Sequence, residues 1–103
     1  MGRLLYGSPP VVFDLEDRTL AHVEIVVLAK LRRNESFAVS FPGKADARTA
    51  IWLNPSSVLQ FEYGVATHTI NRQWLEELIE TANTPQGLHI GDEPKAAKPA
   101  SEG

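Results

Sequence analysis

The fold class is decided by residues 36–63, which read SFAVSFPGKADARTAIWLNPSSVLQFEY. Large apolar residues alternate with small or polar ones over much of this stretch, a pattern typical of half-buried strands. The pattern predicts three strands, at Ser36–Phe41, Arg48–Asn54 and Ser57–Tyr63. The connections between these strands are short, which favours an antiparallel meander.

Helix-like segments flank these strands. The first, Arg18–Arg33, has apolar residues at helical spacing and ends in a basic turn that suits the helix dipole. Alternate positions from 21 to 31 are also apolar and several are β-branched, so a strand is the competing interpretation. The second helix is predicted at Arg72–Asn83, with Asn71 as its N-cap, and Asp17 is the expected N-cap of the first.

The remaining segments complete an α+β fold. Strands at Leu4–Tyr6 and Val11–Leu15, joined by a turn with two prolines, predict an N-terminal β-hairpin. The order is therefore ββαβββα, with helices covering one face of a mainly antiparallel sheet in two layers. Residues 88–90 either add a short strand or pack against the core. Residues 1–91 are expected to form a single compact domain, and residues 92–103 a disordered tail.

Composition excludes several classes of protein. The chain has 103 residues, a formal net charge of −3 and no cysteine, which excludes disulfides, thiolate catalysis and cysteine zinc sites. Its three histidines lack metal-ligand spacing, and no phosphate loop or nucleophile–base pair is present. We therefore expect a non-catalytic protein with no metal and no cofactor. No signal peptide or membrane-spanning stretch is found, so a cytoplasmic location is expected.

Trp52 is the main candidate for a binding residue. Strand alternation in Arg48–Asn54 places Trp52 and Ala50 on the face turned away from the helices. In a meander, Val58 and Gln60 of the next strand lie on that face too. Exposed aromatic residues on a sheet are candidate anchors for partners, so we predict contacts with an unknown protein partner or a second copy through these four residues. The competing interpretation is that the tail, the hairpin or a bend in the sheet covers Trp52.

A small basic patch supports a second hypothesis, binding of nucleic acid through phosphate contacts. Its residues are Lys30, Arg32, Arg33, Lys44 and Arg48. The competing interpretation is a solvated helix end whose cations interact with the helix dipole. The acidic balance of the chain argues against a general nucleic-acid-binding protein.

Five segments carry a family resemblance. They are Gly2–Gly7, Asp17–His22, Lys30–Phe37, Arg48–Leu53 and Ile70–Trp74. Together they resemble a family of short, uncharacterised proteins from high-GC Gram-positive bacteria. The resemblance covers nearly the whole chain except the tail, and members often carry the automatic label "ATP-dependent DNA ligase".

That label implies an adenylate formed on the lysine of a Lys-x-Asp-Gly motif. The nearest match is Lys44-Ala45-Asp46-Ala47, which has alanine where the motif has glycine. The other ligase motifs are missing, and the chain is too short for a nucleotidyltransferase domain. We therefore rank three hypotheses: a protein-interaction domain first, a nucleic-acid-binding or ligase-associated accessory module second, and an ATP-dependent ligase third.

Overall fold

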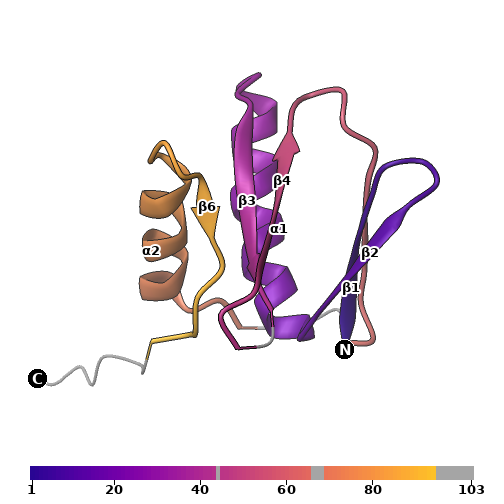
Figure 1. Ribbon diagram of the computed structural model, residues 1–103. Coiled ribbons are helices and arrows are strands. Elements are labelled where there is room, and N and C mark those ends of the chain that lie inside the picture. Colours follow the sequence, from indigo (N-terminus) through magenta and orange to yellow (C-terminus); the bar gives the residue numbers. More distant parts are fainter. Residues whose placement is uncertain (44, 66–68, 95–103) are drawn as a thin grey trace, which may run out of the picture.

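The computed structural model describes residues 1–43, 45–65 and 69–94, and this part of the chain has two helices and six strands (Figure 1). In chain order the elements are β1 (Gly2–Tyr6), β2 (Val11–Leu15), α1 (Asp17–Arg32), β3 (Phe37–Pro42), β4 (Arg48–Leu53), β5 (Leu59–Glu62), α2 (Arg72–Ala82) and β6 (Leu88–His89). The α+β class and the order ββαβββα are confirmed, with β6 added at the end.

The strands form two three-stranded sheets. The first sheet has the order β2-β1-β5, and the second has the order β4-β3-β6, in which β6 runs parallel to β3. The predicted meander is corrected in its last step: β3 and β4 pair antiparallel, but β5 pairs with β1, where Leu4 lies opposite Phe61. A two-stranded hairpin alone is marginally stable, and β5 supplies the third strand beside the fully buried Leu4.

Residues 17–32 form a helix and not a strand. Leu20, Val23 and Val27 are completely buried, whereas Ile25 is 40% exposed. In a strand Ile25 would share a face with Val23 and Val27; the helical turn directs it away from them. The helix ends near Asn34, whose φ of 59° is the left-handed conformation expected of a residue just after a helix.

Asp17 is not the N-cap that its position predicts. The cap is Glu16, whose side chain makes no capping hydrogen bond. The Asp17 carboxylate instead accepts hydrogen bonds from the N–H groups of Gly64 at 3.1 Å and Val65 at 2.8 Å. These bonds, above all the one from Val65, lower the pKa of Asp17. The donors lie 47 and 48 residues along the chain, so a local motif search cannot find them.

Helix α2 begins as predicted, because the Asn71 side chain accepts a hydrogen bond from the Trp74 N–H at 3.2 Å. After α2 the chain returns to the second sheet, so residues 88 and 89 form a strand. The turn into β6 requires Gly87, which has a φ of +85°. A Cβ at this position would lie 2.3 Å from the Ala38 carbonyl oxygen.

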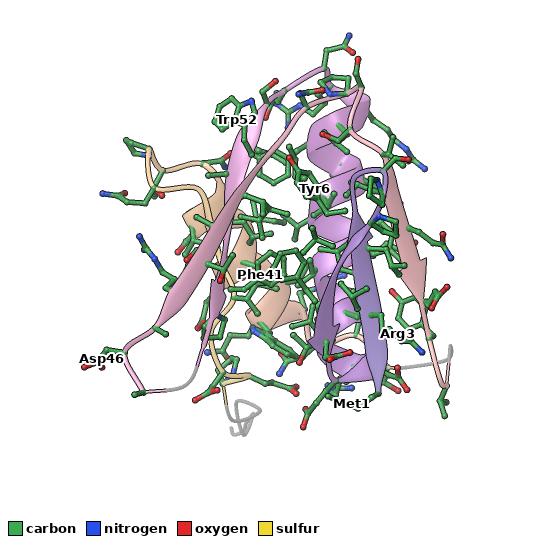
Figure 2. The ribbon with its side chains drawn as sticks, turned by 45° about the vertical axis from the view of Figure 1, so that its right-hand side comes forward. Met1, Arg3, Tyr6, Phe41, Asp46 and Trp52 are labelled. Carbon is green, nitrogen blue, oxygen red and sulfur yellow. The ribbon has the colours of Figure 1, made fainter. Side chains whose placement is uncertain are left out.

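The core joins both sheets to both helices. Helix α1 runs behind β3 and β4, and α2 lies beside β6 (Figure 1). Phe13 of β2 and Phe41 of β3 stack with ring centroids 4.3 Å apart, and Phe41 lies between the two sheets (Figure 2). Neither described helix has the length and apolar character needed to cross a membrane.

Candidate functional site

Strand β4 turns Trp52 away from the core. Leu53 is fully buried and Ile51 is partly buried, while Trp52 is 56% exposed. Ala50 and Arg48, which share the Trp52 side of the strand by alternation, are also exposed. Trp52 and Ala50 thus lie together on an accessible outer face, as the alternation in sequence predicts.

The backbone of β4 also has a free outer edge, which the pairing of β3 reveals. The Ile90 N–H donates to the Ser40 carbonyl at 3.3 Å, so even-numbered residues of β3 point their backbone groups at β6. Odd-numbered residues of β3 must then bond to β4. Because Val39 lies opposite Ile51, the odd-numbered residues of β4 bond back to β3.

The turn before β4 follows the same alternation. The Gly43 N–H donates to the Ala47 carbonyl at 2.8 Å, which again joins two odd-numbered residues across the strand pair. The even-numbered residues of β4 therefore direct their N–H and C=O groups away from β3. These residues are Arg48, Ala50 and Trp52.

One side chain reaches this outer edge. The Tyr6 hydroxyl, at the end of β1, donates to the Trp52 carbonyl at 2.8 Å, and both residues lie at the same end of the molecule (Figure 2). This bond is consistent with a Trp52 carbonyl that points away from β3. The carbonyl oxygen retains a second lone pair that can accept a further hydrogen bond. In the part of the chain that the structure describes, no other hydrogen bond reaches the outward groups of β4. Tyr6 and Trp52 are 46 residues apart, so no local pattern links them.

A groove of about 320 Å³ lies beside Trp52. Ala38 of β3 lines it next to Trp52, Pro85 lines it from the turn after α2, and Lys30 lines it from α1. Small residues beside a large exposed ring leave that ring open to contact from one side. The groove lies on the β3 side of Trp52, so the Trp52 ring stands between it and the outer edge of β4.

The structure does not bring Val58 and Gln60 to this surface. Both are exposed, but Gln60 belongs to β5 and pairs with Leu5 in the first sheet. The prediction that grouped them with Trp52 and Ala50 rested on the meander, in which β5 would follow β4 in one sheet. Only Trp52 and Ala50 of the four share a strand face.

The predicted basic patch is partly occupied by internal contacts. The Lys30 ammonium lies 2.7 Å from a Glu35 carboxylate oxygen, donates to the Asn83 side chain at 2.8 Å and stands 5.6 Å from the Phe37 ring centroid. The Arg33 guanidinium lies 3.3 Å from the same Glu35 carboxylate. The bond from Lys30 is the main reason that the pKa of Glu35 is lowered. Lys30 and Arg33 therefore stabilise the end of α1.

The other basic residues do not complete a patch. Arg32 is exposed on α1, near the Phe37 end of β3, whereas Arg48 pairs with Pro42 at the opposite end of that strand. Lys44 lies outside the described residues. The described cations are thus divided between the two ends of the second sheet, and no single phosphate-binding surface collects them.

The described residues offer no group of three or more side chains that could hold a metal ion. His22 is completely buried, and both ring nitrogens have backbone partners. Its Nδ1 lies 2.8 Å from the Arg18 carbonyl, and its Nε2 accepts from the Asn71 N–H at 2.8 Å. This pair of bonds requires Nδ1–H to donate. His22 thus connects α1 to the start of α2 and presents no free nitrogen for proton transfer.

The segment after β6 is tied to both helices. The Arg18 guanidinium donates to the Glu93 carboxylate through Nε and Nη2, each at 2.7 Å, and Asn71 donates to it at 2.8 Å. These bonds, led by the one from Arg18, lower the pKa of Glu93 to about 2. Composition placed Glu93 in the predicted disordered tail, but in the structure Arg18 and Asn71 bind its carboxylate. The rest of that predicted tail, residues 95–103, lies outside the described residues.

Glu93→Gln is expected to destabilise the fold at neutral pH and to lose that effect in acid. The pKa of Glu93 is about 2 in the fold against an ordinary 4.5, so its stabilisation is complete above pH 4.5 and is lost as the pH falls towards 2. Urea unfolding of both proteins at about pH 6 and about pH 2.5 measures this. Glu76→Gln, at an exposed position of α2, is the control. A wild-type advantage that persists undiminished in acid would contradict the assignment.

Comparison with protein families identifies one match. The model of the family described as "Domain of unknown function (DUF7882)" matches residues 1–93. The chain belongs to this family. The matched part of this DUF7882 chain includes every described helix and strand and ends at Glu93, the residue clamped by Arg18. Neither the curated proteins nor the solved structures gave a match.

Membership in DUF7882 agrees with the resemblance to a family of uncharacterised proteins. These comparisons give no support to the ligase label. Lys44, the position of the proposed adenylated lysine, lies outside the described residues. Of the predicted binding residues, the geometry brings together Trp52, Ala50 and Arg48 on β4.

Proposed function

We propose that this domain is a non-catalytic protein-interaction module that binds an extended segment of another chain along the outer edge of β4. The observation that supports this is an edge strand whose outward backbone groups have no strand partner, beside a tryptophan that is 56% exposed. Unpaired strand edges are templates for the addition of a further strand. Main-chain hydrogen bonds give such a complex its affinity, and pockets for side chains give it selectivity.

Trp52 supplies the selective part of this surface. An aromatic ring at an interface removes a large apolar area from water when a partner covers it. Trp52 is 56% exposed beside the free edge of β4, so a segment that pairs with this edge can cover its ring. A partner whose segment pairs with β4 and covers the Trp52 ring satisfies both features.

Charge favours a protein partner over a nucleic acid. The chain has a formal net charge of −3, and Lys30 and Arg33 are paired with Glu35. Breaking these pairs to contact phosphates would remove bonds that stabilise the end of α1. A protein segment that binds along the outer edge of β4 would leave these ion pairs intact.

Photo-cross-linking in the native cell tests the proposal. A benzophenone amino acid in place of Trp52 is expected to give a discrete adduct, whereas the same group in place of Ile79, which is 40% exposed on α2, is expected to give none. Ala50→Pro should abolish the adduct, because proline removes an outward N–H and leaves the bonds to β3 intact. No adduct from position 52, or an adduct that survives Ala50→Pro, would refute the proposal.

A further inference from the structure

The chain that adds to β4 can be identified from the strand itself. We infer that it is the β4 strand of a second copy, joined antiparallel about a two-fold axis at Ala50. The inference rests on the proposed function and names its partner. Two-fold dimers are the commonest protein oligomers, and their interfaces require a surface that is complementary to itself.

The outward backbone groups of β4 are complementary in one register. With Ala50 opposite Ala50 of the second copy, Arg48 lies opposite Trp52 on both sides of the axis. All these residues point their backbone groups outward, so each opposed pair exchanges two N–H···O bonds. Three pairs give about six bonds across the interface. The Tyr6 hydroxyl occupies one lone pair of the Trp52 carbonyl, and the second lone pair accepts the bond from the other copy.

The side chains are complementary in the same register. Opposed residues in an antiparallel pair point to the same face, so each Arg48 guanidinium lies beside the Trp52 ring of the other copy. Arginine against the face of a tryptophan is a favourable cation–π pair. Ala50, the residue at the axis, is small enough for its own copy to lie directly opposite. Figure 2 shows Trp52 at one end of β4 and Asp46 in the turn before the other end. Strand β4 begins at Arg48, two residues after Asp46.

The other sheet edges offer shorter surfaces. The Gly7 N–H donates to the Val58 carbonyl, so the odd-numbered residues of β1 point their backbone groups at β5. The even-numbered residues of β1 then point theirs at β2. The outward backbone groups are then those of Val12 and Asp14 in β2, and those of Leu59 and Phe61 in β5. Strand β6 has only two residues. Among the described strands, β4 presents the longest run of outward groups, and this run begins with a cation and ends with an aromatic ring.

A charge-pair experiment tests the axis directly. Ala50→Glu and Ala50→Lys each place two like charges side by side, at about 5 Å between Cβ atoms. Each variant alone is expected to dimerise at least about tenfold more weakly than wild type in sedimentation velocity. An equimolar mixture of the two is expected to restore a species of two chains, because opposite charges then meet. The matched pair Ala29→Glu and Ala29→Lys, at an exposed position of α1, should behave as wild type.

The outcomes separate this inference from the proposed function. If wild type remains monomeric at high concentration, or if Ala50→Glu dimerises as wild type does, the inference is overturned. A position-52 adduct with the mass of two chains, lost with Ala50→Glu, supports it. An adduct with a different protein overturns the second copy as partner and leaves the interaction module standing. Circular dichroism of each variant verifies that the fold is retained.

Discussion

Gly87→Ala is expected to lower the free energy of unfolding by about 3 kcal/mol or more. The residue has a φ of +85°, which strains any side chain. The added Cβ would lie 2.3 Å from the Ala38 carbonyl oxygen and 2.8 Å from its carbonyl carbon. Both atoms belong to the backbone of β3 and cannot rotate away, so the turn must shift and separate β6 from β3. Urea unfolding monitored by tryptophan fluorescence measures the loss.

Gly91→Ala provides the matched control. A Cβ at Gly91 would meet only a His89 ring carbon, at 3.8 Å, which is an ordinary contact distance. Its effect on the free energy of unfolding should stay within about 0.5 kcal/mol. Equal effects at the two glycines would show that the close approach of Gly87 to β3 is not a determinant of stability.

His22→Ala is expected to cost about 3 kcal/mol of stability. The imidazole is completely buried and packs on the Trp74 ring with centroids 4.6 Å apart. Removing it leaves a cavity between the two helices and leaves the Asn71 N–H without its acceptor. Both losses act on the start of α2, so this helix should lose protection from hydrogen exchange before α1 does.

His89→Ala is the control for this substitution, since the His89 side chain is exposed. It should change the free energy of unfolding by no more than about 0.5 kcal/mol. A His22 variant as stable as wild type would contradict the view that this residue fastens α2 to α1.

The surface around Trp52 shows which of its features a sequence pattern can predict and which it cannot. Alternation along β4 places Trp52 and Ala50 outward, and they are exposed. The same reasoning added Val58 and Gln60, because nearness in sequence suggested that β5 pairs with β4. That pairing was decided instead by β1, which needs a second neighbour for the buried Leu4. The outer edge of β4 is free because β5 pairs with β1 and not with β4, and the proposed mode of binding depends on this free edge.

The polar contacts show the same limit. Asp17 has the right position and chemistry for an N-cap, but donors 47 and 48 residues away bind its carboxylate. Glu93 lies in a stretch of tail-like composition, but Arg18, 75 residues earlier, holds it at 2.7 Å. Asn71 was predicted correctly because a cap bonds to a residue only three positions away.

The spacing of apolar residues along the chain was enough to predict the α+β class, the order of the elements and the outward direction of Trp52. These properties depend on side-chain periodicity and on bonds between near neighbours, which spacing encodes directly. Strand partners, the clamp on Glu93 and the free edge of β4 required the folded arrangement. They depend on which distant segments meet when apolar faces are buried, and many pairings are compatible with one alternating pattern until packing selects among them.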